Sequence, residues 1–585
     1  MAPMKKLPVD IQILAKLQHL INTNATLFDN QETLEVRPAF ELSRGEPDSA
    51  RPYIQVRARR VDLLKAKLPP NLGGVPLRVV QGTLYEQAIR AIALARSAAT
   101  PEIAATAWRT GLLDVVTEAR DYSTLTYRPV NPTWLVPVDG QMTLVIHVSP
   151  EAGWLELGKF LTPLSDWMIA MYDFTAPHII AKLDGAVRKP GGTISLVLDP
   201  KISLPTAKQR REHPDDPKAN DRTEVSLVEE YRKQFGSHFH FSWASIGSHA
   251  QFASAYHIKV AVRDQKAFWL SSGNWQSSNQ PDIDFLKNGN GQSADKDLLR
   301  TSAHYNREWH VICENSKLAD IYRKYIERDL SNAQGSPGPD GDKSGVDEAV
   351  DTLPHISDED FVMELRSPTD IEAEAEIPRM PRRFFPPLTL PTRSFQVQPI
   401  LTPDNYADHV LPLVQSAKSR LWFQNQSLSV IETRSDKYSN LLEALKRQSW
   451  DIEDCKIIFR DFIRSKTLDY LRSLSEFGFN MSKVHVMKNC HTKGILVDSR
   501  RTLVGSHNWT NEGTTYNRDA SLLFDDAEVT KYFEQVFEHD WDNLSYDLPV
   551  PEVARSFIAY PGESVPEAAI ATRYPWDPNN DGSDT

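Results

Sequence analysis

The feature that most constrains this fold is an internal repeat, in which two distant stretches of the chain alternate strands and helices in the same order. The stretches span residues 136–330 and 395–545 of the 585-residue chain. In the second, short apolar segments such as RLWFQNQSLSV and KIIFRDF alternate with amphipathic segments such as KYSNLLEALKRQS, as strands and helices do. Such alternation is typical of βαβ units. We therefore expect an α/β fold with two similar αβ sandwich repeats related by a pseudo-two-fold axis.

Three segments lie outside the two repeats. Residues 1–135 contain a long amphipathic stretch, LYEQAIRAIALARSAATPEIAATAWRTGLLDVV, so we predict a mainly helical N-terminal region, to which we assign no role. Residues 331–394 are rich in Gly, Pro and acidic residues, which predicts a disordered linker, with a docking or inhibitory segment as the alternative. Residues 546–585 form an acidic tail.

The net charge of −12 is unevenly distributed along the chain. Residues 331–380 contain 13 acidic and 3 basic residues, and residues 546–585 contain 7 acidic and 2 basic residues, so the rest of the chain carries a net charge of +3. A nearly neutral body can approach a phosphate without strong repulsion. The acidic composition therefore does not exclude a phosphate-bearing substrate.

The composition also bears on location and on redox chemistry. No stretch approaches the 18 consecutive apolar residues of a membrane-spanning helix. The first 20 residues carry Asp10 and Lys16 within their apolar pattern, unlike a secretory signal, so we expect a cytoplasmic protein. Cys313, Cys455 and Cys490 are far apart in the sequence and form neither a disulfide framework nor a zinc pattern.

Both repeats end in the same pattern of polar residues. The first contains YHIKVAVRDQKAFWLSSGNW and the second CHTKGILVDSRRTLVGSHNW, and each is followed by one further acid, in YNREW and YNRDA. The matched residues are His257, Lys259, Asp264, Ser272, Asn274 and Glu308 in the first copy, and His491, Lys493, Asp498, Ser506, Asn508 and Asp519 in the second.

The spacing within this pattern has a physical reason. Residues two apart on a strand share a face, so His-x-Lys presents an imidazole and an ammonium group side by side. Ser and Asn follow a second strand, in a turn where they can offer hydrogen bonds. Two copies meeting at a pseudo-dyad would surround one point with donors and positive charge, which suits a phosphoryl group. Lysines and amides can hold the nonbridging oxygens, so we expect neither a metal ion nor another cofactor.

The paired HxK(x)4D(x)6GSxN pattern resembles the phospholipase D superfamily, which comprises two-HKD phosphodiesterases and phosphatidyltransferases. The second copy matches through Gly505, whereas the first has Ser271 in place of that glycine, which predicts a strained or reshaped turn. The resemblance covers about residues 140–330 and 395–545. It implies the phospholipase D fold for both repeats.

The resemblance also implies a two-step reaction through a covalent phosphohistidine. We assign His257 as the nucleophile and His491 as the general acid and base, although the symmetry of the motifs leaves the reverse open. Imidazole suits both tasks because its pKa lies near neutrality. The remaining catalytic residues are Lys259, Asn274, Lys493 and Asn508. The supporting residues are Ser272 and Ser506, with Glu308 and Asp519 expected to orient the imidazoles, and Asp264 and Asp498 expected to tie the strand ends.

Three functions fit these residues. The leading hypothesis is a phosphodiesterase that hydrolyses a phospholipid, with possible transfer to alcohols, in peripheral contact with a membrane. The first alternative is a nuclease of the same superfamily, supported by the nearly neutral body and by basic stretches such as KQRR at residues 208–211. The second is an inactive binding or regulatory module that uses the acidic linker. We expect a monomer, because both half-sites are in one chain.

Overall fold

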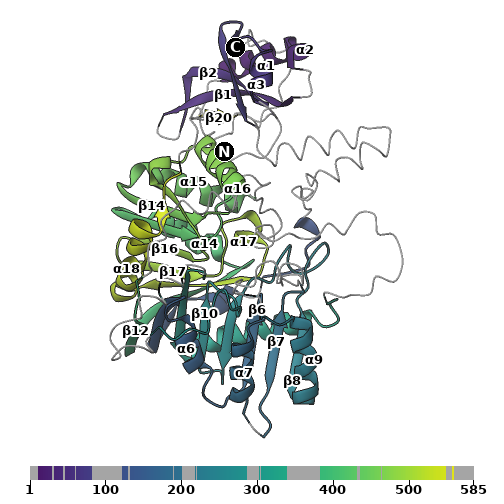
Figure 1. The fold of residues 1–585 in the computed structure, drawn as a ribbon, viewed down its shortest axis with the longest axis vertical. Coiled ribbons are helices and arrows are strands. Elements are labelled where there is room, and N and C mark those ends of the chain that lie inside the picture. The colour runs from purple at the N-terminus through teal and green to yellow at the C-terminus, as the bar shows by residue number, and fades with distance from the viewer. Residues whose placement is uncertain are drawn as a thin grey trace, which may run out of the picture.

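The computed structural model of the chain describes residues 11–28, 32–43, 46–58, 61–81, 122–129, 132–188, 190–200, 218, 220–285, 299, 302, 305–338, 383–430, 435–462, 464–548 and 556–558. Within these residues, two halves that match the predicted repeats form the body of the molecule, and a smaller N-terminal module lies beside the second half (Figure 1).

Both halves alternate strands and helices as predicted. The strands of the first half are β5 (Val138–Ser149), β6 (Trp167–Met171), β7 (Ile194–Leu198), β8 (Phe239–Trp243), β9 (Lys259–Arg263), β10 (Ala267–Ser271) and β11 (Glu308–Glu314). Its helices are α6 (Gly153–Phe160), α7 (Pro177–Ala186), α9 (Glu224–Phe235) and α11 (Ser316–Asn332).

The strands of the second half are β12 (Leu388–Thr402), β13 (Arg420–Asn425), β14 (Asp454–Arg460), β15 (Val484–Met487), β16 (Lys493–Val497), β17 (Arg501–Gly505), β18 (Asp519–Asp525) and β19 (Ser545–Tyr546). Its helices are α14 (Tyr406–Gln415), α15 (Asp436–Asp451), α16 (Arg464–Phe477), α17 (Asn511–Thr515) and α18 (Ala527–Asn543).

One 15-stranded mixed sheet runs through both halves, and its strand order is mirrored about the centre. The second half contributes β19-β15-β14-β13-β16-β17-β18-β12, and the first continues with β5-β11-β10-β9-β6-β7-β8. The parallel pairs also match, since β6-β7-β8 corresponds to β13-β14-β15. The halves join where β5 and β12 pair antiparallel. This order is the one that a pseudo-two-fold axis between β5 and β12 requires.

Helices cover both faces of the sheet and enclose three apolar cores with it. In the first half α6, α7 and α9 enclose one apolar core with β6 and β7, and in the second α14, α15 and α16 enclose another. The largest core lies between α11 and α18 and includes residues of both halves. There the rings of Trp309 and Phe533 stack with centroids 4.4 Å apart. The two halves therefore share a core and do not form separate globules.

A buried arginine of each half ties that half to the other. In the second half, Nη1 of Arg518 lies 3.1 Å from Asp404 of its own half, and Nη2 lies 2.7 Å from Asp329, on α11 of the first half. The Arg518 side chain is fully buried, so its charge is compensated only by protein groups. The same arrangement occurs around Arg307, which lies 2.6 Å from Glu151 and 2.9 Å from Asp540.

The prediction of a mainly helical N-terminal region is wrong for residues 33–81. These residues form β1 (Thr33–Ser43), β2 (Glu46–Ala58), β3 (Asn71–Leu72) and β4 (Val75–Gln81), with short helices α1 (Ile11–Thr23), α2 (Ala25–Phe28) and α3 (Val61–Lys65). The reason is an alternating pattern: Ile54, Val56 and Ala58 share one face of β2 and pack with α1 and α3 in a small apolar core. The amphipathic stretch at 82–121 lies outside the described residues.

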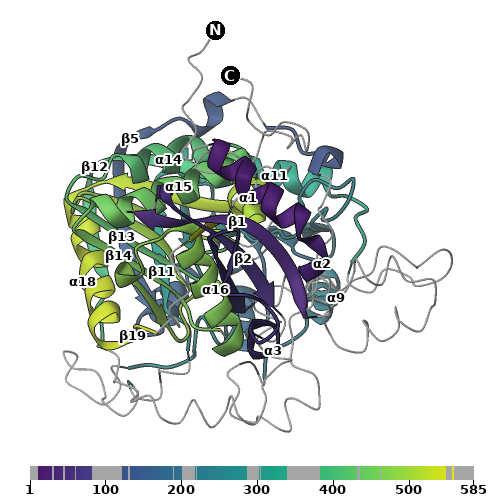
Figure 2. The same cartoon turned by 90° about the horizontal axis from the view of Figure 1, so that it is seen from above.

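The predicted boundaries of the linker and the tail also change. Residues 339–382 lie outside the described residues, so the predicted disorder there stays a prediction. At the linker's ends, α11 continues to Asn332 and β12 begins at Leu388, where Leu388 and Leu390 pair with β5. In the tail, β20 (Ser556–Ile558) pairs with β1 and contacts α16. β20 thus forms an edge strand of the N-terminal sheet, which lies over α15 and α16 (Figure 2).

Candidate active site

Strand geometry brings the two histidine segments to the boundary between the halves. Lys259 and Lys493 are the first residues of β9 and β16, so His257 and His491 lie just before these strands. Backbone hydrogen bonds hold each histidine segment to the opposite half. The Arg307 amide donates to Asn489 at 2.8 Å, that of His491 donates to Arg307 at 3.1 Å, and that of Arg518 donates to Ala255 at 3.2 Å.

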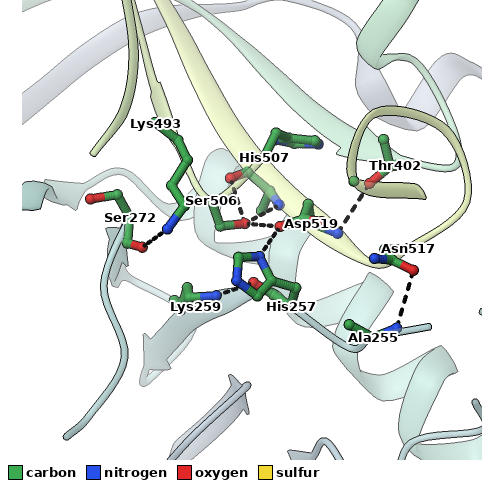
Figure 3. A network of polar contacts seen from close by, with 12 residues as sticks. Ala255, His257, Lys259, Ser272, Thr402, Lys493, Ser506, His507, Asn517 and Asp519 are labelled. Carbon is green, nitrogen blue, oxygen red and sulfur yellow. Dashed lines mark hydrogen bonds and ion pairs between the residues drawn. The ribbon is translucent and has the colours of Figure 1, made fainter. Parts of the chain in front are cut away.

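Each histidine is paired with the acid of the other half. Nδ1 of His257 lies 2.8 Å from Oδ1 of Asp519, at the start of β18 (Figure 3). Nδ1 of His491 lies 2.7 Å from Oε1 of Glu308, at the start of β11. All four side chains are buried. The structure therefore places the two acids against the imidazoles, but crosswise between the repeats.

Both lysines lie at the same site as the histidines. Nζ of Lys259 donates to the carbonyl of His257 at 2.6 Å and lies 5.0 Å from the centre of the Tyr172 ring. Nζ of Lys493 donates to the carbonyl of Ser272, in the other half, at 3.2 Å. Burial raises the pKa of Asp519 to about 7, and Lys259, a bond from Ser506 and Lys493 act in the opposite direction. Because both lysines act on this one carboxyl, the two motifs meet at one place.

The motif serines hold the two acids. Ser272 Oγ donates to Glu308 Oε2 at 2.6 Å and accepts from the Trp309 amide at 3.0 Å. Ser506 makes the equivalent bonds in the second half, at 2.6 Å to Asp519 and 3.1 Å from the Ala520 amide. Both hydroxyls are therefore committed to the carboxylates that contact the histidines.

The motif asparagines present oxygens toward buried space. Nδ2 of Asn274 donates to Asp173 at 2.8 Å. Within the described residues, Oδ1 of Asn274 and Oδ1 of Asn508 are buried without a hydrogen-bond partner. Such atoms are costly unless a ligand or a water molecule satisfies them.

Asp264 and Asp498 are not brought to the site. They follow the far ends of β9 and β16, with left-handed φ values of 49° and 52°, about 16 Å along the strand from Lys259 and Lys493. Asp264 accepts from the Asp166 amide at 3.0 Å, and Asp498 accepts from the amides of residues 418–420 at 2.9–3.1 Å. These contacts anchor the strand ends.

The turn at Ser271 shows no strain. Ser271 ends β10 and has no left-handed φ, and its Oγ accepts from the Gly273 amide at 2.7 Å and contacts His310 Nδ1 at 2.6 Å. In the second copy a Cβ on Gly505 would lie 1.8 Å from Ser521 Oγ, so that copy needs glycine. The predicted strain is wrong, because His310 in place of a second serine accommodates the hydroxyl.

A second difference between the two copies compensates for the unequal lengths of Glu308 and Asp519. A Cβ on Gly273 would lie 2.5 Å from the Glu308 carboxyl carbon. The equivalent position of the other copy is His507, which is tolerated because Asp519 is one methylene shorter than Glu308. The longer acid is thus matched with glycine.

Replacing Gly273 with alanine is expected to displace the Glu308 carboxylate from His491. Overpacking of this kind costs about 1–3 kcal/mol, and we expect turnover to fall by about tenfold or more through the misplaced pair. Initial rates and urea unfolding would measure both effects. Gly185→Ala is the control, because nothing lies within 4 Å of a Cβ there; an equal loss of activity in both variants would contradict this reading.

Sequence reasoning missed three contributors to the site. Arg307 and Arg518 follow Tyr-Asn in both copies, and this repeated YNR was a signal that could have found them. Asn279 contacts Glu308 and lies 3.4 Å from His491 Nδ1. Its counterpart in the second copy is Gly513, so the repeat carries no signal for it.

The three cysteines are buried thiols. Burial raises the pKa of Cys490, next to His491, to about 12, so it stays protonated near neutral pH. Among the residues that the structure describes, no three His, Cys, Asp or Glu side chains gather in a way that could hold a metal ion.

None of the helices in the described ranges is long and apolar enough to cross a membrane.

Parts of the chain are similar in sequence to known proteins. A family model described as cardiolipin synthase, PLD-like domain, matches residues 410–541. The mitochondrial cardiolipin hydrolase of Xenopus laevis is 27% identical over 166 residues, which are 27% of this chain and 75% of that protein. The enzyme of the same name from Xenopus tropicalis is 42% identical over 61 residues, so the match spans only 10% of this chain and 29% of that protein.

Two solved structures are also similar. Phosphatidylserine synthase from Haemophilus influenzae has a TM-score of 0.39 and 12% identity, over 69% of this chain and 87% of that one. Nuc, a phospholipase D family member from Salmonella typhimurium, has a TM-score of 0.21 and 21% identity, over 26% of this chain and 98% of that one.

The mirrored halves and the crossed histidine–carboxylate pairs define an α/β protein that builds one site from two His-x-Lys motifs. The match to the PLD-like family model covers the second of these motifs. Over residues 410–541 the chain is therefore similar to the phospholipase D superfamily.

Proposed function

We propose that this protein is a phosphodiesterase that hydrolyses a phospholipid through a covalent phosphohistidine. The observation that carries the proposal is the crossed pairing of His257 and His491 with buried carboxylates through Nδ1. A carboxylate at Nδ1 holds the proton there, so Nε2 is the nitrogen that reacts. Two imidazoles oriented in this way supply one nucleophile and one acid–base group.

In the first step, Nε2 of His257 attacks phosphorus. The new N–P bond forms as the bond to the leaving oxygen breaks, and protonated His491 gives its proton to that oxygen. The products of this step are an alcohol and a phosphohistidine at residue 257. Lys259 and Lys493 balance the charge on the nonbridging oxygens.

In the second step, water replaces the alcohol. His491, now neutral, takes a proton from water as its oxygen attacks phosphorus, and the N–P bond breaks. This restores His257 and releases a phosphomonoester. An alcohol in the place of water would give a new diester, which is the basis for transfer of the phosphatidyl group.

The phospholipid substrate is supported by the relatives and not by a lipid-shaped groove. The Xenopus proteins are named as cardiolipin hydrolases, and the matching family model is described as cardiolipin synthase. We further propose that the protein is a monomer, because its two half-sites are fused in one chain. Our proposal also places it in the cytoplasm, in peripheral contact with membranes.

Parallel assays would test the substrate. Vesicles of phosphatidylcholine and of cardiolipin, and a single-stranded DNA oligonucleotide, would be incubated with the protein in EDTA, with and without added ethanol. We expect lipid cleavage, with phosphatidylethanol as a product when ethanol is present. Cleavage of DNA alone, with the steep salt dependence of phosphate contacts, would identify a nuclease. Cleavage of no diester would favour a binding module.

A further inference from the structure

The two histidine–carboxylate pairs are unequal. Oε2 of Glu308 accepts a hydrogen bond from Ser272. Oε1 of Glu308 contacts both His491 and the side-chain amide Nδ2 of Asn279. In Asp519 a single oxygen, Oδ1, both accepts the hydrogen bond from Ser506 and contacts His257. Its Oδ2 is buried and has no hydrogen-bond partner within the described residues. The amide of Asn279 is the group that makes the difference.

The fold offers this amide in one half only. Asn279 is buried in the loop after β10, where its backbone N–H donates to the carbonyl of Gln276 at 3.1 Å and its Oδ1 accepts from Ser278 at 3.0 Å. The counterpart in the second half, Gly513, lies in α17, and a Cβ there would lie 2.5 Å from the Asn508 carbonyl oxygen. An asparagine therefore cannot be accommodated beside Asp519.

We propose that Asn279 is a positioning residue for His491 and acts through Glu308. The proposal rests on the proposed function and deepens it, because it makes the His491 pair the firmly held member of an otherwise symmetric site. An amide nitrogen only donates, so at 3.4 Å from His491 Nδ1 its hydrogen goes to Glu308. It prevents the carboxylate from turning away from Nδ1, where the proton of His491 is held.

Two groups of opposite charge, Glu308 and Lys493, contact the His491 ring. Nζ of Lys493 lies 3.0 Å from Nδ1 and 3.3 Å from Nε2, so it opposes protonation of the ring, whereas Glu308 favours it. A small rotation of the carboxylate would let the lysine dominate. The amide thus protects the proton that the leaving group needs.

Asn279→Ala tests the proposal through kinetics. The loss of a hydrogen bond to a charged group is expected to lower kcat by about 10- to 100-fold with KM nearly unchanged, because the amide does not contact the substrate. Asn543→Ala is the matched control, since this amide bonds only to His539 within the described residues. A kcat within about threefold of the parent value, or a change confined to KM, would overturn the proposal.

Asn279→Asp separates positioning from mere packing. The introduced carboxyl would lie against Glu308, so its pKa would be raised, and when protonated it could donate as the amide does. Activity relative to the parent is therefore expected to recover as the pH is lowered, which Asn279→Ala cannot show. Equal losses in both variants at every pH would overturn the proposal.

A measurement without turnover distinguishes failure of the inference from failure of the proposed function. In protein labelled with ¹³Cε1-histidine, the His491 resonance is assigned by its loss in His491→Ala and followed by NMR during a pH titration. The midpoint should fall in Asn279→Ala and rise in Asn279→Asp. Such shifts in a protein that cleaves no diester would retain the positioning role and reject the phosphodiesterase. Unshifted midpoints would reject the role of Asn279.

Discussion

Replacing His257 with alanine is expected to abolish the first bond-breaking step, with turnover lower by more than about 10³-fold. Replacing His491 is expected to lower turnover similarly on lipids, but to spare the first step for a substrate whose leaving group needs no proton. With a nitrophenyl phosphodiester, His491→Ala should release a burst of about one nitrophenol per protein molecule, whereas His257→Ala should release none. Stopped-flow absorbance would measure the burst.

The control for these variants is His240→Ala, because His240 is exposed on the edge strand β8. It should turn over like the parent protein. A burst in His257→Ala and none in His491→Ala would reverse the two roles, and normal turnover in both variants would refute the phosphohistidine pathway.

Replacing Arg518 with methionine is expected to destabilise the fold by about 3–5 kcal/mol, because it leaves Asp329 and Asp404 buried without their cation. The free energy of unfolding would be followed in urea. Arg323→Met is the control: this residue also pairs with two carboxylates, Asp320 and Glu327, but at the surface, where such pairs contribute less than about 1 kcal/mol.

A partial rescue would show that uncompensated charge is the cause. The substitutions Asp329→Asn and Asp404→Asn, added to Arg518→Met, remove both buried carboxylates. They should recover part of the lost stability. If Arg518→Met and Arg323→Met lower the urea midpoint by the same amount, the buried ion pairs do not hold the halves together.

Much of the fold follows from local sequence pattern. The strands and helices of both halves obey their periodicities, and the spacing from His257 to Asn274 lies within one hairpin, so it places its side chains without reference to the rest of the chain. The strands of the N-terminal module were also visible, since Ile54 and Val56 alternate with polar residues. The longer amphipathic stretch that follows outweighs this pattern in the composition of residues 1–135.

The rest of the site depends on contacts that no local pattern carries. The repeat predicted that Glu308 and Asp519 serve the histidines, but not that each serves the histidine of the other half, because that choice is made by the pairing of β5 with β12. Asn279 lacks a counterpart in the repeat. The role of Gly273 emerges only when its contact with Glu308 is seen.

Because the histidine–carboxylate pairs are crossed, each functional unit of this site combines one residue from each repeat. His257 and Asp519 form one unit although they are 262 residues apart in the sequence, and His491 and Glu308 form the other. A substitution of the carboxylate in one half therefore affects the imidazole of the other half. Double substitutions at these residues should fall into two groups. The groups would be set by the His257–Asp519 and His491–Glu308 pairs, and not by which repeat each residue belongs to.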